Sequence, residues 1–373
     1  MKWAFWMAAA LIGYAYFGYP AWLYVRSRWS PRPVRRGAIE PAVSAVVVAR
    51  NEEQAIDAKL RNLLALDYPA QKLDVVVVSD GSSDGTEGIL RNRARDPRVR
   101  PVLKAAPQGK AAGLNDAIKV ASGEILLLTD ARQEIEVGAL RRLVQNFADP
   151  DVGCASGELM LGNTGSGEAG KGMGLYWRIE KKIRELESAS GSVAGATGAI
   201  YCARKALLEA LPEGTILDDV LLPMQVVRQG YRVVFDSEAR AWDSPDLGQG
   251  REFERKVRTL SGNYQLLQLA PWLLSSQNLI RFEFISHKLL RLIVPFALLA
   301  LLVSSLFLPG AFYRAVLAAQ IVFYCMSGMA GAGVKIGPLS RVADAARTFV
   351  VLNSAAAVAF INFVSGRKVA WIR

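Results

Sequence analysis

The stretch Val43-Ser44-Ala45-Val46-Val47-Val48-Ala49 decides the fold, and it leads directly into Arg50-Asn51-Glu52-Glu53. A short β-branched run of this kind predicts a buried strand, and the polar residues after it predict a loop. Apolar residues at helical spacing between Ile56 and Leu64 then predict a helix. We therefore expect a strand, a loop and a helix in that order.

The same alternation continues along the next part of the chain. Further strands are predicted at Leu73–Ser79, Val102–Leu103 and Glu124–Thr129. Helices are predicted from Glu87 to Arg95 and from Lys110 to Ile118. Apolar strands that alternate with helices indicate an α/β fold whose sheet is mostly parallel and covered on both faces.

Polar side chains stand where the predicted strands end. Asn51, Asp80 and Asp130 each follow a strand, and Lys110 follows the short third strand. Ligands of open α/β sheets bind beyond the carboxyl ends of the strands. The sequence therefore predicts a binding site built from these residues.

The loop Ser79–Thr86, Ser-Asp-Gly-Ser-Ser-Asp-Gly-Thr, is the strongest local signal of that site. Its glycines allow a tight turn and its serines can cap the next helix. The Asp80 carboxylate can accept hydrogen bonds from a ribose or a base. The alternative is a purely structural role, an Asx turn with capping, and this role explains Asp84 better than Asp80.

The sequence contains neither GxGxxG nor GxxxxGK[ST], the glycine-rich patterns of dinucleotide-binding and P-loop proteins. Phosphate would therefore have to be bound by residues outside such a loop. Lys110 opens a predicted helix, where its charge and the helix dipole together suit a diphosphate. The alternative interpretation of Lys110, an ordinary surface lysine, is equally compatible with the sequence.

Acidic residues supply the remaining candidate chemistry. Asp130 could bind a divalent cation that bridges two phosphates, and Arg132 could hold phosphate through its planar fork. Asp218 and Asp219 are adjacent acids, which raise one another's pKa when they share a site and so suit a general base. Their alternative role is to place negative charge at a helix start.

The hydrophobic content of 51% indicates that part of the chain lies in a membrane. Uncharged runs long enough to cross a bilayer as helices are Trp3–Val25, Leu292–Tyr313, Ala315–Val334 and Thr348–Gly366. The first lacks a cleavage site and is expected to be an anchor, whereas the last is the most polar and could instead be a buried helix. We expect an anchor at residues 1–29, a soluble domain at 30–276 and transmembrane helices at 292–373.

Arginines after the first run, against Lys2 alone before it, predict that the soluble domain faces the cytosol of a multi-pass inner-membrane protein. Three C-terminal spans would conflict with this rule by placing Arg367 and Lys368 outside. The net charge of +11 is scattered or lies beside apolar runs, which favours membrane lipids as partners over nucleic acid.

Residues 277–291 mix apolar and charged side chains and predict an amphipathic interfacial helix that holds the site against the bilayer. The only histidine, His287, lies in this helix rather than among the acids. We expect it to serve packing or the interface, not catalysis.

Taken in order, these motifs resemble the inverting glycosyltransferases of family 2, which have the GT-A fold, and specifically the membrane branch of cellulose, hyaluronan and poly-N-acetylglucosamine synthases. The resemblance runs from about Val43 to Gly262. The motifs that carry it are Val46–Glu53, Ser79–Thr86, Gly109–Asn115, Asp130–Arg132 and Asp218–Asp219.

The resemblance implies a role for each site residue. Asp219 would be the general base beside Asp218, Arg258 would assist the departing diphosphate, and Asp130 would hold Mg²⁺ or Mn²⁺. Thr197 and Gly198 lie in the loop Ala196–Tyr201, which looks like the loop that shapes the acceptor site. The implied donor-binding residues are Asn51, Glu52, Asp80, Lys110, Asp130, Arg132 and Lys256.

Two motifs depart from the family pattern. Arg132 stands where a second metal-binding acid is usual, and Arg255 and Thr259 replace the glutamine and tryptophan of the motif around Arg258. We expect transfer from a nucleotide sugar, with UDP favoured, to a lipid-linked or polysaccharide acceptor. A processive synthase and a non-catalytic nucleotide-sugar binding module are the alternatives.

Overall fold

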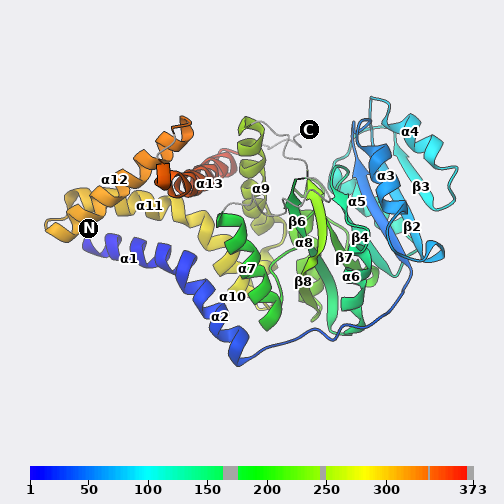
Figure 1. The fold of residues 1–373 in the computed structure, drawn as a ribbon, viewed down its shortest axis with the longest axis horizontal. Coiled ribbons are helices and arrows are strands. Elements are labelled where there is room, and N and C mark those ends of the chain that lie inside the picture. The colour runs from blue at the N-terminus through cyan, green and yellow to red at the C-terminus, as the bar shows by residue number, and fades with distance from the viewer. Residues whose placement is uncertain (163–174, 244–248, 335–336, 368–373) are drawn as a thin grey trace.

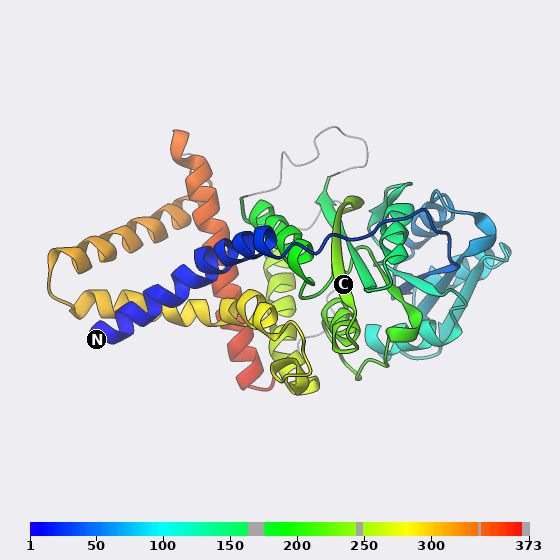
Figure 2. The ribbon, with the colours of Figure 1, turned by 90° about the horizontal axis from the view of Figure 1, so that it is seen from below.

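The computed structural model describes residues 1–162, 175–243, 249–334 and 337–367. An α/β domain occupies one end of the molecule and a group of long helices the other (Figure 1). The chain leaves the helical end after residue 29, runs along the α/β domain and enters the sheet at Val43 (Figures 1 and 2).

The described residues form one eight-stranded sheet in the order β3-β2-β1-β4-β7-β6-β8-β5. Its first half is parallel, as the sequence predicts, and consists of β1 (Val43–Ala49), β2 (Leu73–Asp80), β3 (Val99–Lys104) and β4 (Ile125–Leu128). In this register Ala49 lies beside Ser79, so the polar residues after β1 and β2 meet at one edge.

The second half of the sheet is mixed, which differs from the mostly parallel sheet expected. It contains β5 (Glu134–Ile135), β6 (Val152–Leu161), β7 (Tyr201–Arg204) and β8 (Arg232–Asp243). β7 runs antiparallel to β4 and pairs Tyr201 with Leu128. This reversal brings the residues before β7 to the carboxyl end of β4, where Asp130 lies.

Helices cover both faces of the sheet because alternate side chains of β1 point to opposite faces and all are buried. Val46 and Val48 pack in one apolar cluster, and Ala45 and Val47 in the other. The helices around the sheet are α3 (Ile56–Leu64), α4 (Thr86–Arg93), α5 (Lys110–Val120), α6 (Ala139–Gln145), α7 (Leu175–Ser190), α8 (Asp218–Arg228) and α9 (Gln249–Leu269). Short 3₁₀ turns are Ala70–Lys72, Asn146–Ala148, Lys205–Leu207, Pro271–Leu274 and Gly337–Leu339.

Within the described residues, three helices are long and apolar enough to cross a membrane: Arg281–Phe307, Ala311–Gly331 and Ser340–Val364. They correspond to the three C-terminal runs of the sequence, with shifted ends. The first comprises α10 (Arg281–Phe284), a π-helical turn (Ile285–Leu289) and α11 (Leu290–Phe307), followed by α12 (Ala311–Gly331) and α13 (Ser340–Val364). Large apolar side chains such as Leu299 and Ile361 are exposed on them, as a lipid-facing surface requires.

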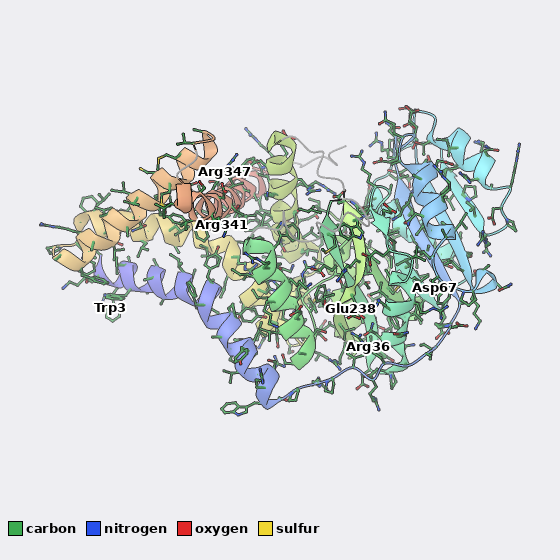
Figure 3. All side chains as sticks on the ribbon, in the orientation of Figure 1. Trp3, Arg36, Asp67, Glu238, Arg341 and Arg347 are labelled. Carbon is green, nitrogen blue, oxygen red and sulfur yellow. The ribbon has the colours of Figure 1, made fainter. Side chains whose placement is uncertain are left out.

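The N-terminal segment forms α1 (Lys2–Gly13), a π-helical turn (Tyr14–Gly18) and α2 (Tyr19–Trp29). α1 packs along α11, and Trp3 stands exposed at the end farthest from the sheet (Figure 3). This segment is not among the three membrane-length helices, and its role as an anchor stays a prediction.

The expected interfacial helix at residues 277–291 is not a separate element. Helix begins at Arg281 and continues without a break into α11. His287 is 2% exposed, and its Nδ1 and Nε2 each lie 2.8 Å from a carboxylate oxygen, of Glu187 and Glu180 respectively. Because both acids belong to α7, His287 fastens the first membrane helix to the α/β domain.

Replacing His287 by alanine would leave Glu180 and Glu187 without one of their buried partners. We expect His287→Ala to destabilise the protein by roughly 3 to 5 kcal/mol, the usual cost of breaking a buried ionic contact. Thermal unfolding of the detergent-purified protein measures this change. Lys182→Ala, at an exposed position of α7, is the control, and equal melting temperatures for the two variants would contradict the fastening role.

Candidate active site

Asn51 joins the loop after β1 to the loop after β2. Its φ of 55° lies in the left-handed region, which asparagine tolerates better than most residues. Its Oδ1 accepts a hydrogen bond of 2.8 Å from the Ser83 amide, and its own amide donates to Ser82 Oγ at 3.1 Å. The Glu52 amide donates to Thr86 Oγ1 at 2.9 Å, so the two loops form one surface.

Asp80 lies fully buried beneath the loop that precedes α5. Its Oδ1 and Oδ2 accept hydrogen bonds of 2.8 Å from the amides of Gln108 and Gly109. Gly109 has a φ of 94°, a conformation that favours glycine. Asp80 therefore fixes the start of α5, and its direct contact with a ribose or base stays a prediction.

Lys110, the first residue of α5, lies between two acids. Its Nζ is 2.8 Å from Asp130 Oδ1 and 3.0 Å from Asp218 Oδ1. Burial would lower the pKa of Lys110, but the charges of Asp130, Asp218 and Asp219 outweigh burial and raise that pKa. Lys110 is therefore a charged member of the cluster, not an ordinary surface lysine.

Asp219 stands at the first turn of α8, opposite the loop before β7. Its Oδ2 accepts a hydrogen bond of 3.1 Å from the Gly198 amide, and its carbonyl accepts one of 2.7 Å from the Ala196 amide. Burial, followed by the charge of Asp218, raises the pKa of the Asp219 carboxyl to about 6. A carboxyl that titrates near neutral pH suits a general base.

Gly198 allows two carboxylates to approach the same point. A Cβ at this position would lie 3.3 Å from Asp130 Oδ2 and 3.4 Å from Asp219 Oδ2. The neighbouring Thr197 amide donates to Ser156 Oγ at 3.1 Å, which fixes the loop on β6. The loop before β7 therefore borders both Asp130 and Asp219.

Arg132 is paired with Glu52, in the loop after β1. Its Nε lies 3.0 Å from Glu52 Oε1 and 2.9 Å from Glu52 Oε2. The Arg132 guanidinium is therefore engaged in an ion pair with Glu52. In the described part of the chain no group of three or more acids, histidines or cysteines is arranged to hold a metal.

The helix α9 supports the loop that leads to the two acids of α8. Gln265 Nε2 donates to the Gly214 carbonyl at 2.9 Å, and Gln265 Oε1 accepts from the Ile216 amide at 2.9 Å. A Cβ at Gly262 would lie 2.6 Å from Leu217 Cγ, so only glycine permits this approach. Sequence reasoning missed both residues, although a glycine inside a helical pattern is a signal of close packing.

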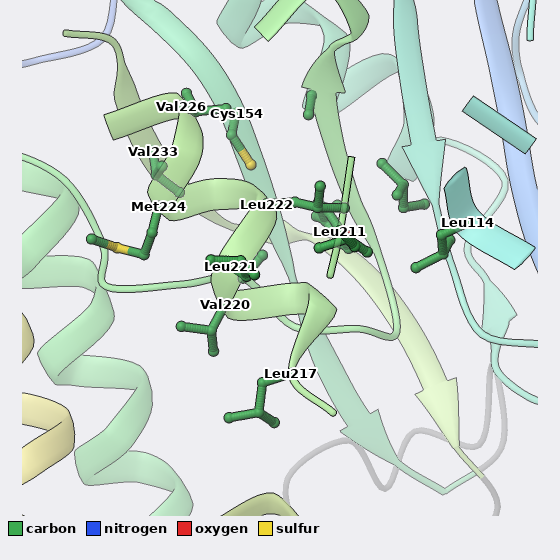
Figure 4. Packing of buried hydrophobic residues seen from close by; sticks show 14 of the residues in the cluster. Leu114, Cys154, Leu211, Leu217, Val220, Leu221, Leu222, Met224, Val226 and Val233 are labelled. Carbon is green, nitrogen blue, oxygen red and sulfur yellow. The ribbon is translucent and has the colours of Figure 1, made fainter. Parts of the chain in front are cut away.

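The body of α8 is held by the apolar core. Leu221, Leu222 and Met224 are buried, and they pack with Cys154 and Val233 of the sheet (Figure 4). This packing anchors the helix whose first two residues are Asp218 and Asp219.

Lys256 and Arg258 lie in the first half of α9. Arg255 pairs with Asp243 across a distance of 3.6 Å, at the end of β8. Within the described residues Arg258 forms no ion pair with the acidic cluster. Contact of these two cations with a diphosphate stays a prediction.

The sheet has a parallel half with Asp130 beyond β4, and its mixed half is joined by α8, which begins with Asp218 and Asp219. This arrangement is typical of the GT-A fold of nucleotide-diphospho-sugar transferases. Residues 44–211 match the family model for glycosyl transferase family 2.

Two curated synthases are similar in sequence to this chain. The chain is 29% identical over 199 residues to the beta-monoglucosyldiacylglycerol synthase of Synechocystis sp., covering 52% of this chain and 42% of that one. It is 25% identical over 230 residues to the poly-beta-1,6-N-acetyl-D-glucosamine synthase of Staphylococcus aureus, covering 60% and 55%. The chain thus spans about half the length of the curated relatives it matches.

The fold likeness extends over almost the whole chain. A mannosyltransferase from Pyrobaculum calidifontis, solved in complex with GDP-mannose and Mn²⁺, matches with a TM-score of 0.72 and 22% identity. The match covers 98% of this chain and 100% of that chain. It supports the GT-A fold with attached helices.

The close packing of Gly262 gives a test of how α9 positions the acids. We expect Gly262→Ala to displace Leu217 and with it Asp218 and Asp219, and to lower kcat for sugar transfer by roughly tenfold or more, as misplacement of catalytic groups does. Steady-state kinetics measure it. Gly88→Ala is the matched control, because that helical glycine has open space around it. Equal kcat values in both variants would contradict the positioning role.

Proposed function

We propose that this protein is an inverting glycosyltransferase that moves a sugar from a nucleotide-diphosphate donor to an acceptor hydroxyl at a membrane surface. The observation that carries the proposal is the cluster of Lys110, Asp130, Asp218 and Asp219, in which the half-buried carboxyl of Asp219 has a pKa of about 6 beside the charged amine of Lys110. Such a pairing provides a base for the acceptor and positive charge for the leaving group.

In the proposed reaction the acceptor hydroxyl gives its proton to the Asp219 carboxylate as its oxygen attacks the anomeric carbon. The bond from that carbon to the diphosphate oxygen breaks, and the nucleoside diphosphate leaves with the electron pair. Lys110 and Arg258 stabilise the negative charge that develops on it. A single displacement inverts the configuration at the anomeric carbon.

The donor lies across the ends of β1, β2 and β4 in this proposal. Asn51 and Asp80 shape the two loops below the nucleoside, whereas Glu52 and Arg132 border the phosphates together with Lys256. UDP is the proposed nucleotide. Thr197 and Gly198 face the acceptor, because they border Asp219.

A divalent cation fits this site with few protein ligands. Asp130 has an exposed carboxylate, and Mg²⁺ sites of this kind use one or two carboxylates together with substrate phosphates and water. When bound, the cation neutralises diphosphate charge. The metal dependence of this chain rests on Asp130 alone, since Arg132 is an ion-pair partner of Glu52.

The acceptor is proposed to be lipid-linked or a glycan, with the α/β domain on the cytosolic face of a multi-pass inner-membrane protein. The named relatives make a glycolipid and a polysaccharide, and the chain has three membrane-length helices among its described residues. Processive synthesis with export of the polymer is the second candidate. Thr259, in place of the family tryptophan, favours transfer of one or a few sugars.

Substitution of Asp219 tests the base directly. Asp219→Asn is expected to lower kcat by roughly 10² to 10⁴-fold, the usual contribution of general base catalysis, with donor affinity preserved. The native protein should lose activity as the pH falls through about 6, because protonation of Asp219 removes the base.

The measurement is a pH profile of kcat/KM with UDP-sugars and extracted lipid acceptors. Asp67→Asn serves as the control, since Asp67 is an acid on the surface of the α/β domain (Figure 3). It pairs with Arg141. Full turnover by Asp219→Asn would contradict the assigned mechanism.

Metal dependence is tested by binding rather than turnover. We expect Mn²⁺ to strengthen binding of a UDP-sugar to the native protein, seen as a larger thermal shift, because ligands stabilise the folded state by mass action. Asp130→Asn should remove the effect of Mn²⁺ while leaving the shift with donor alone. A donor-induced shift of the native protein that ignores Mn²⁺ would contradict the role of Asp130.

A further inference from the structure

Lys59 is a buried lysine that the proposed reaction does not use. It lies on α3 and is 3% exposed. Its Nζ donates hydrogen bonds to Thr129 Oγ1 at 2.8 Å and to the Gln133 carbonyl at 2.7 Å. Lysine is rarely buried to this extent, because neutral partners replace the hydration of its ammonium only in part. The cost of burying this ammonium points to a role beyond filling the interior.

The two partners of Lys59 stand on either side of Asp130-Ala131-Arg132. Thr129 directly precedes this turn, and Gln133 directly follows it. Among the residues that the structure describes, no backbone–backbone hydrogen bond holds residues 130–133. The shape of the turn therefore depends on side-chain contacts. Lys59 supplies a contact at each end and so joins the two ends of the segment that carries the proposed metal ligand.

The charge of Asp130 acts on the same ammonium. Burial lowers the pKa of Lys59 to about 7, whereas the charges of Asp130 and Glu134 act to raise that pKa. No hydrogen bond or ion pair joins the side chains of Lys59 and Asp130, both of which lie in the described part of the chain. Lys59 is thus near Asp130 but contacts the turn on either side of it.

Thr129 extends the contact to the loop before β7. Its Oγ1 donates a hydrogen bond of 2.6 Å to the Ala199 carbonyl and accepts the one from Lys59. Ala199 follows Gly198, whose amide donates to Asp219. One buried ammonium is therefore linked, through one hydroxyl, to the two loops that border the proposed metal ligand and the proposed base.

Asn62, on the same helix, makes a polar contact of a different kind. Its Nδ2 donates to the Ile135 carbonyl at 2.8 Å, and its Oδ1 accepts from the Ile135 amide at 2.9 Å. These bonds hold β5, which follows the turn, and they involve neither Asp130 nor the loop before β7. α3 therefore carries two polar side chains one helical turn apart, of which only Lys59 holds the turn itself.

We propose that Lys59 is a positioning residue for sugar transfer. Its ammonium fixes the turn so that the Asp130 carboxylate stays where it can bind a divalent cation, and through Thr129 it holds the loop before β7 against Asp219. This inference rests on the proposed function. Lys59 acts only through its neighbours, so its loss should weaken cation binding and slow transfer while binding of UDP without metal is kept.

The test is Mn²⁺ binding by Lys59→Met in the full chain, because methionine fills most of the space and removes the charge and the donors. The EPR signal of free Mn²⁺ measures its binding to protein saturated with UDP, independently of turnover. We expect Mn²⁺ affinity to fall by roughly tenfold or more, the usual effect of losing a residue that orients a metal ligand. The kcat for sugar transfer should fall by a similar factor, and the thermal shift with UDP alone should be preserved.

Asn62→Leu is the matched control, because it removes two hydrogen bonds from the same helix without touching the turn. It should lower the melting temperature and leave Mn²⁺ affinity and kcat close to those of the native protein. Thr129→Val repeats the test in case Lys59→Met fails to fold. It keeps the shape of the side chain and removes the hydroxyl that links Lys59 to Ala199, so it should also weaken Mn²⁺ binding.

Unchanged Mn²⁺ affinity and kcat in both Lys59→Met and Thr129→Val would overturn the proposal and leave Lys59 a structural role only. An equal loss of Mn²⁺ affinity in Asn62→Leu would overturn it too, since the effect would then not belong to the turn. A native protein that binds UDP equally with and without Mn²⁺ would overturn it together with the role of Asp130. Absence of both UDP binding and turnover in the native protein would instead remove the proposed function.

Discussion

The contact of Lys110 with Asp130 and Asp218 is the interaction on which the rest of the site depends. It ties the start of α5 to the end of β4 and to the start of α8, three segments that are far apart in the sequence. Without the amine, the carboxylates gathered there would repel one another. With it, Asp219 can remain close to two other acids and still titrate near neutral pH.

The parallel half of the fold could be predicted because its signals are local. Each apolar strand is followed by a polar residue, and parallel pairing then aligns Asn51, Asp80 and Asp130 at one edge. The directions of the side chains could not be predicted. The side chains of Asn51 and Asp80 accept hydrogen bonds from neighbouring loops. No sequence pattern distinguishes a polar side chain that faces a ligand from one that holds a loop.

The mixed half of the sheet escaped prediction because its pairing is long-range. β7 pairs with β4 across more than seventy residues of chain, and its reversal alone places Gly198 between Asp130 and Asp219. Residues whose role lies in a contact between distant segments leave little trace in their local sequence.

Two helices connect this site to the membrane-length helices. α9 packs against α13, where Tyr264 stacks on Phe363 at 5.3 Å, and one face of the same helix holds the loop before Asp218. α7 contacts His287 through Glu180, and its Ser188 Oγ accepts a hydrogen bond from the Phe235 amide of β8. Figures 1 and 2 show both helices between the sheet and the long helices. Donor chemistry and membrane location are therefore parts of one packed structure.

The anomeric configuration of the first product tests the account most directly. In a reaction with an α-linked UDP-sugar, proton NMR of the earliest product reports whether the new bond is β or α. Direct attack by an acceptor that Asp219 deprotonates predicts a β-linked product from the first turnover. An α-linked product would contradict a single displacement and, with it, the role assigned to the acidic cluster.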